Sequence, residues 1–314
     1  MAISGPPRYA LRTLEEAEME RKTANDFPPD LLILFDAYVH GAIDRRGFLD
    51  KAKKFAVGGV TATMLLDSLN PNFVAAQQIA PDDKRLKTEY LEYDSPKGNG
   101  KMKGYFAQPA NRKDRLPGVL VVHENRGLNP HIEDIARRLA LDNFVAFAPD
   151  ALTPLGGYPG NEDKAREVFP KLDQAKTRED FVTAFGVLKA RPECSGRVGA
   201  VGFCYGGAIA NMLATRLPDL GAAVPFYGTQ PPPADVPNIK APLLIHYAGV
   251  DERVNAGWPA YETALKANNI KYTAYIYEGA QHGFNNDTTP RYDEKAAKLA
   301  WQRTVDFFNQ NLRK

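Results

Sequence analysis

Apolar residues change their spacing several times along the second part of the chain, and each spacing predicts an element. The alternation in residues 88–93 predicts a strand, and residues 104–107 read as its hairpin partner. The continuous apolar run at 118–123 is typical of a central strand that is buried on both faces. Further strands are expected at 144–148, 198–203, 222–227, 243–248 and 272–277, and helices at 132–141, about 161–190 with a break at Pro170, 206–217, 261–267 and 294–312.

This alternation of strands and helices predicts an α/β catalytic domain over residues 81–314. Its sheet should be mostly parallel and twisted, with helices on both faces and an antiparallel hairpin at 88–108. Chemistry in such folds takes place at the carboxyl ends of the strands. The candidate functional residues should therefore follow strands along the chain.

Residues 1–80, here called the N-terminal extension, have a different pattern. An acidic stretch of helical spacing at 14–19 and an apolar run at 31–35 precede the pair Arg45-Arg46. After the arginine pair come lysines, then a mildly apolar stretch at 55–66, and then small residues up to Ala76. This order resembles a twin-arginine export signal, which would place the protein in the periplasm. The alternative is an amphipathic helical extension of a cytoplasmic protein, packed on the catalytic domain or on a second subunit of a homo-oligomer.

Composition excludes several functional classes. The formal net charge is only +2, and the basic residues are dispersed, so we expect no nucleic-acid partner. No run approaches the roughly 20 apolar residues of a membrane span. Two cysteines among 314 residues are too few for a disulfide framework. We therefore interpret at least one of these cysteines as a reactive thiol.

Cys204 lies in the pattern Gly202-x-Cys204-x-Gly206-Gly207, between a predicted strand and a predicted helix. A nucleophile at such a turn has a strained backbone, and its neighbours must be small because strand and helix approach closely. The helix N-terminus favours the thiolate. The backbone N–H of Tyr205 would point to a developing oxyanion. The alternative is a buried structural cysteine beside a glycine-rich turn.

Asp251 and His282 follow two later strands, in the order nucleophile, acid, histidine that α/β-hydrolases share. An acid just past the strand at 243–248 can reach a histidine on the next loop. Glu252 is the neighbouring candidate. The pattern acid-x-x-Val, which ends at Val254, favours Asp251. Of five histidines, His282 is the one in a loop after a late strand.

A further loop, residues 123–127, follows the central strand. In this position Asn125 would give the second backbone N–H of an oxyanion hole. Glu124 would lie near the thiol and could accept its proton, or it could instead form a salt bridge with Arg126. His123 is interpreted as a structural residue.

Together, Glu124, the Gly-Phe-Cys204-Tyr-Gly-Gly motif, Asp251 and His282-Gly-Phe resemble the dienelactone hydrolase family from about residue 86 to the end of the chain. The resemblance implies the α/β-hydrolase fold and a Cys-His-Asp triad with an assisting glutamate. It also implies hydrolysis of lactones or small esters through an acyl-cysteine, with no metal and no cofactor. In the family, arginines bind the substrate carboxylate, one of them shortly after the histidine; here Arg291 is the nearest arginine.

Three functions remain open from the sequence. The first is a cysteine hydrolase of lactones or small esters, similar to carboxymethylenebutenolidase. The second is a general carboxylesterase with an unrelated physiological substrate. The third is a non-catalytic thiol protein that binds or senses oxidants, since an accessible thiolate oxidises readily. Every position of the catalytic set is filled, which favours the first two.

Overall fold

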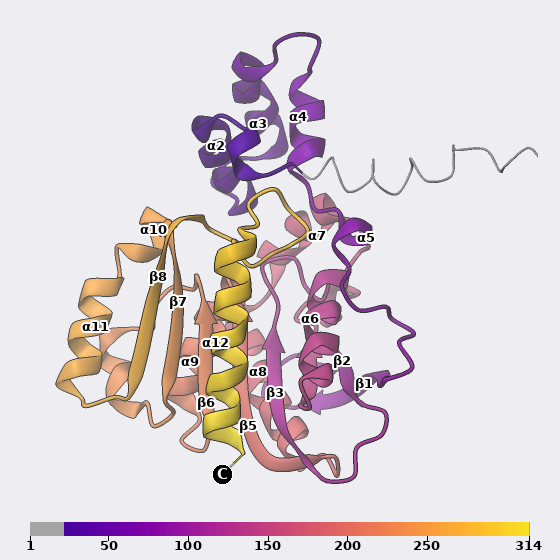
Figure 1. The fold of residues 1–314 in the computed structure, drawn as a ribbon, viewed down its shortest axis with the longest axis vertical. Helices are drawn as coiled ribbons and strands as arrows, with labels where there is room; N and C mark the ends of the chain where they lie inside the picture. Colours follow the sequence, from indigo (N-terminus) through magenta and orange to yellow (C-terminus); the bar gives the residue numbers. More distant parts are fainter. Residues whose placement is uncertain (1–21, 314) are drawn as a thin grey trace, which may run out of the picture.

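An eight-stranded sheet forms the centre of the protein, in a computed structural model that describes residues 22–313 (Figure 1). The strand order is β1-β2-β4-β3-β5-β6-β7-β8. β1 pairs antiparallel with β2, and β2 with β4, whereas the remaining neighbours in this sheet are parallel. The strands are β1 (Leu86–Ser95), β2 (Gly100–Pro109), β3 (Leu116–Val122), β4 (Val145–Pro149), β5 (Cys194–Phe203), β6 (Ala222–Phe226), β7 (Leu243–Val250) and β8 (Tyr272–Gln281).

Helices cover both faces of this sheet. On one face α8, α9 and α11 share an apolar core with the strands, and on the other face α6 and α12 do the same. The helices are α2 (Pro29–Val39), α3 (Arg45–Ala52), α4 (Ala62–Leu69), α5 (Phe73–Ala76), α6 (Pro130–Leu141), α7 (Glu162–Val168), α8 (Gln174–Ala190), α9 (Tyr205–Arg216), α10 (Glu252–Asn255), α11 (Trp258–Ala267) and α12 (Glu294–Leu312). Short 3-10 helices are η1 (Ala24–Asp26), η2 (Lys53–Phe55), η3 (Thr153–Leu155), η4 (Phe169–Lys171) and η5 (Pro233–Asn238).

The central strands β3 and β5 position the candidate site. Their residues 119–122 and 198–203 are buried, as a strand covered on both faces requires. Val122 pairs with Gly202 at the carboxyl ends of these parallel strands. The loop after β3 and the turn after β5 therefore begin side by side. This brings residues 123–127 next to Cys204.

The N-terminal extension forms a small helical unit above the carboxyl edge of the sheet (Figure 1). Its helices α2, α3 and α4 share an apolar core of their own. The buried members are Phe27, Leu31, Leu32, Phe35, Tyr38, Phe48, Ala52, Leu66 and Leu69. The chain then runs through α5 towards the catalytic domain, where the backbone N–H of Ile79 donates to Asp134 of α6.

The structure confirms the predicted α/β class, the sheet, the antiparallel hairpin and the break near Pro170, where η4 separates α7 from α8. The acidic stretch at 14–19 lies outside the described residues. Arg45 and Arg46 begin α3, and the side chain of Asp44 caps that helix by accepting from the N–H of Gly47. Within residues 22–313 no helix is both long and apolar enough to cross a membrane.

Candidate active site

Cys204 lies directly between β5 and α9, at the carboxyl edge of the sheet. Its backbone has φ 54° and ψ −111°, a strained conformation for a residue with a side chain. A Cβ atom at Gly202 would lie 1.9 Å from the carbonyl oxygen of Gly206, and one at Gly206 would lie 2.2 Å from that of Val122. Backbone segments meet at this turn, so the motif needs its glycines. The side chain of Cys204 is partly exposed.

An acid–histidine pair stands beside the thiol. Nδ1 of His282, which directly follows β8, lies 2.5 Å from Oδ2 of Asp251, which directly follows β7. The other oxygen of Asp251 accepts from the N–H of Val254 and caps the short helix α10. Both residues are buried, whereas Glu252 is exposed. Nε2 of His282 is buried without a hydrogen-bond partner, so it is free to exchange a proton with a reacting group.

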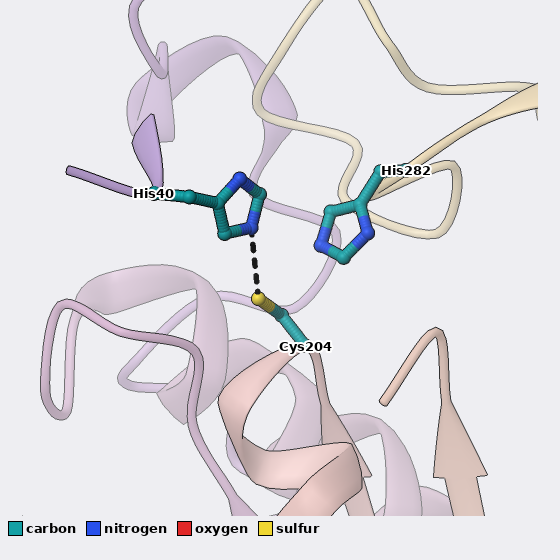
Figure 2. Close-up of side chains that lie close together, drawn as sticks. All are labelled: His40, Cys204 and His282. Carbon is teal, nitrogen blue, oxygen red and sulfur yellow. Dashed lines mark hydrogen bonds between the residues drawn. The ribbon is translucent and has the colours of Figure 1, made fainter. Parts of the chain in front are cut away.

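A second histidine faces the same sulfur, and it comes from the N-terminal extension (Figure 2). Nε2 of His40, just after α2, lies 3.4 Å from Sγ of Cys204 and forms a hydrogen bond with it. The ring of His40 contacts the ring of His282 edge-on, with centroids 4.7 Å apart. Two imidazole rings therefore converge on one thiol.

The charges of this cluster favour a thiolate. Burial of Cys204 acts to raise the pKa of its thiol, but the charges of His282 and His40 outweigh burial and lower that pKa to about 5. Burial likewise disfavours a charged His282, yet the thiolate and Asp251 raise the pKa of its ring to about 10. The same balance, with Asp36 in place of Asp251, raises the pKa of His40 above its ordinary value. These opposite directions favour a thiolate–imidazolium pair over a neutral pair near neutral pH.

The loop after β3 lies against the extension. The side-chain amide of Asn125 and the guanidinium of Arg126 both donate to the carbonyl oxygen of Val39, each at 3.0 Å. Arg126 also forms an ion pair with Glu162, at 3.7 Å. Glu124 instead accepts a hydrogen bond of 2.8 Å from Asn286. The alternative of a salt bridge between Glu124 and Arg126 is therefore not what the structure shows.

Polar contacts fix the extension around the site. Arg291 donates to Asp36 at 3.2 Å, and its guanidinium lies over the ring of Phe35. Farther from the thiol, Tyr38 and Arg45 both bind the carboxylate of Asp163 on α7, at 2.5 and 2.8 Å. The first arginine of the suspected export signal thus holds the extension to the catalytic domain.

Two of the cavities between the extension and the catalytic domain are lined by residues of the site. One, of about 40 Å³, is lined by Tyr38, Glu124 and Arg126 among others. The other, of about 270 Å³, includes Asp251 and His282 in its wall. Ligand pockets usually measure roughly 300–1,000 Å³. The cavity that includes His282 is slightly smaller than that range, and the other one holds little more than water.

Comparisons with known proteins agree with this geometry. The sequence model of the dienelactone hydrolase family matches residues 102–312, more than half of the chain. The chain belongs to the dienelactone hydrolase family. A second sequence model, named YqhI-like, matches residues 19–57, which include His40.

Relatives of this dienelactone hydrolase family member cover its catalytic domain. "Putative carboxymethylenebutenolidase" of Saccharolobus solfataricus is 31% identical over 262 residues, covering 69% of this chain and 96% of that protein. Protein usf of Aquifex pyrophilus is 37% identical over 232 residues, covering 69% and 96%. The crystal structure titled "Putative Dienelactone Hydrolase" of Klebsiella pneumoniae superposes with a TM-score of 0.63 at 29% identity, covering 71% of this chain and 99% of that one. The protein is accordingly a hydrolase that acts on ester bonds of a small-molecule substrate.

Among the residues predicted for the site, Cys204, Asp251 and His282 are brought together, and Glu124 and Asn125 lie on the neighbouring loop. Tyr205 is the first residue of α9, so its N–H has no partner within the helix. The side chain of His123 has a structural contact, because its Nε2 accepts a hydrogen bond from the backbone N–H of Ala151. The backbone donors of the oxyanion hole remain a prediction.

Two neighbours of the thiol were missed from the sequence. His40 lies inside the segment interpreted as an export leader, and only its rarity as one of five histidines could have drawn attention. Tyr227 directly follows β6, so the rule that sites lie at strand ends could have found it. Its ring lies 5.0 Å from that of His282, and its buried hydroxyl has no hydrogen-bond partner.

Among the residues that the structure describes, one group of side chains could hold a metal ion. One ligand atom each from His40, Cys204 and His282 lie within 4.8 Å of one another. A thiolate and two imidazoles suit Zn²⁺ or Cu²⁺. Occupation by such a cation would block the nucleophile, so assays of this protein need a chelator.

Proposed function

We propose that the protein hydrolyses lactones or small carboxylic esters through an acyl-cysteine intermediate. The Cys204 thiolate attacks the carbonyl carbon, and the N–H groups of Asn125 and Tyr205 stabilise the oxyanion that forms. The C–O bond breaks as His282 gives its proton to the leaving alkoxide, with Asp251 holding the ring in place. In deacylation neutral His282 takes a proton from water, the hydroxide attacks the acyl carbon, and the thiolate leaves.

The observation that carries this proposal is the thiol of Cys204 at the strained turn with the buried His282–Asp251 pair beside it. A thiol of ordinary pKa would be mostly protonated at neutral pH, whereas one with a pKa of about 5 is deprotonated. The unpartnered Nε2 of His282 supplies the proton that the leaving group needs.

The size of the site supports a small substrate. The cavity that includes His282 measures about 270 Å³, and Leu32, Ile33 and Asp36 of the extension form part of its wall. Arg291 and Arg126 line the walls near the thiol, but each is already bound to an acidic residue. A neutral lactone or ester therefore fits the site with less rearrangement than a dicarboxylate does.

A short-chain aryl ester tests this function directly. The wild type should release the phenol, and mass spectrometry of a rapidly quenched reaction should find the acyl group on Cys204. Cys204→Ala should lose both signals, whereas Cys194→Ala, which removes the other thiol, should keep them. Full turnover by Cys204→Ala, or an acyl group on another residue, would refute the acyl-cysteine mechanism.

A further inference from the structure

The active site contains two imidazole–carboxylate pairs. His282 is held through Nδ1 by Asp251, and His40 is held through Nδ1 by Asp36, whose carboxylate lies 3.2 Å away. The Nδ1 atom also lies 2.9 Å from the backbone oxygen of Asp36. Each pair leaves an Nε2 atom turned to the thiol. Hydrolysis by a triad needs only one of them.

We propose that His40 is a catalytic residue supplied by the N-terminal extension: oriented by Asp36, its imidazolium holds the negative charge on Cys204 while His282 moves the proton. This role rests on the proposed function, in which Cys204 is the nucleophile. The catalytic domain alone would then be an incomplete enzyme. Its thiolate needs a second cation, His40, which directly follows α2 in the extension.

The surroundings of His40 set its charge. Asp36 and the Cys204 thiolate favour the imidazolium, and His282 opposes it as a second cation. Nη2 of Arg253 on α10 also lies 3.1 Å from Nε2 of His40, but Arg253 is exposed, so solvent screens its charge. Arg291 binds the same carboxylate of Asp36 and keeps it ionised. A partly buried carboxylate within hydrogen-bond distance therefore fixes the orientation of the ring and favours its protonated form.

Two histidines divide tasks that one residue cannot perform at the same time. In acylation the S–C bond forms, the C–O bond breaks and the proton of His282 goes to the leaving alkoxide. His282 is then neutral and can take a proton from water. When the C–S bond breaks, sulfur departs with the electron pair, and the imidazolium of His40 stabilises that thiolate. His40 keeps its own proton throughout, so the proton balance closes on His282 alone.

The pH dependence of Cys204 alkylation tests the role of His40 without any ester. Iodoacetamide labelling of the full chain, in EDTA and followed by peptide mass spectrometry, gives the pH midpoint of the thiolate. His40→Ala should move that midpoint upward by about one unit, which lowers labelling about five- to tenfold near pH 5 relative to the plateau. Asp36→Asn should give a smaller shift in the same direction. Both should lower kcat/KM for an aryl ester.

Arg45→Gln is the matched control, because it loosens the extension at Asp163 without touching the thiol. Its labelling midpoint should equal that of the wild type. An equal shift in this variant would mean that docking, not the charge of His40, sets the midpoint, and the proposal would fail. Unchanged labelling in His40→Ala would mean that His40 does not stabilise the thiolate. Faster ester hydrolysis in that variant would mean that His40 obstructs the substrate. Either result would also overturn the proposal. If His40→Ala shifts the midpoint but the wild type hydrolyses no ester, the proposed function is rejected. The stabilisation of the thiolate by His40 would still be supported.

Discussion

The two cysteines of this chain have opposite surroundings. Cys204 faces His40 and His282, and these charges lower its pKa to about 5 despite burial. Cys194 lies fully buried in the core at the start of β5, where burial raises its pKa. Since the thiolate is the reactive form, iodoacetamide should label Cys204 much faster than Cys194 at neutral pH. Labelling should fall as the pH drops through about 5, because the thiolate then gains a proton.

The same difference in acidity predicts the outcome of Cys204→Ser. A serine hydroxyl must lose its proton during attack, and a site built around an existing thiolate does not drive that step. Ester hydrolysis should fall by orders of magnitude while circular dichroism shows an unchanged fold. If the serine variant acylated as fast as the wild type in a single turnover, or if Cys194 were labelled first, the thiolate argument would be wrong.

Removal of His282 and of its acid should differ in severity. His282→Ala removes the group that moves protons, and most of kcat/KM for an aryl ester should be lost. Asp251→Asn keeps the ring and removes only the charge that steadies the imidazolium, so the loss should be smaller. Steady-state kinetics of both variants check this order. Small, equal losses would identify a different base, with Glu124 the first residue to test.

The candidate triad could be predicted from the sequence because Cys204, Asp251 and His282 each follow a strand of one parallel sheet. The carboxyl ends of such strands meet at one edge, so their order along the chain determines their proximity. His40 precedes the sheet and reaches the thiol only through packing of α2. Nothing in the local pattern of residues fixes that docking, which depends on long-range contacts such as the one between Val39 and Asn125.

The turn between β5 and α9 depends on a close approach of backbone to backbone. A methyl group on Gly206 would lie 2.2 Å from the carbonyl oxygen of Val122, and neither backbone can move without shifting β3 or α9. Gly206→Ala should therefore lower the free energy of unfolding by about 1–3 kcal/mol or more. Thermal and urea unfolding measure this, and activity should fall with the displaced turn.

Gly186 in α8 is the matched control for this prediction. A Cβ atom there would meet nothing within 4 Å, and the residue lies inside a helix. Gly186→Ala should raise the free energy of unfolding by roughly 0.5–1 kcal/mol, because alanine loses less backbone freedom than glycine. Equal destabilisation by both substitutions would show that the close approach at Gly206 is not what the motif requires.

The elements of the catalytic domain were predictable because their spacing is regular. Runs buried on both faces, such as β3, and the helical period of α12 follow directly from burial. The extension was harder to interpret. Its residues 55–66 are only mildly apolar, and Val57 and Val60 are exposed at 71% and 38%, so they give no clear face. The core of α2 and α3 instead uses aromatic residues, such as Phe35 and Phe48, that lie far apart in the sequence.

At the scale of the whole molecule, the extension and the catalytic domain have separate cores but one active site. The buried members of the two cores beside the sheet all come from residue 86 onward. Deletion of residues 1–76 should therefore leave a folded, soluble domain, with a cooperative thermal transition. It removes His40, so ester hydrolysis should remain measurable but fall to the level of full-length His40→Ala.

This deletion also bears on the export hypothesis. A signal peptidase cutting near Ala76 would release a catalytic domain without His40, whereas a retained extension keeps the second imidazole at the thiol. Intact mass of the protein, purified from its native cell and from each cell fraction, identifies which form is present.

If the deletion variant matched the activity of the full chain and a periplasmic form began near residue 77, the extension would be a leader. An insoluble deletion variant would mean that the buried residues of α2, such as Leu31 and Phe35, serve the catalytic domain as well. We expect the full-length form, because Asn125, Arg126 and Arg291 of the catalytic domain all use their side chains to hold α2 over the site.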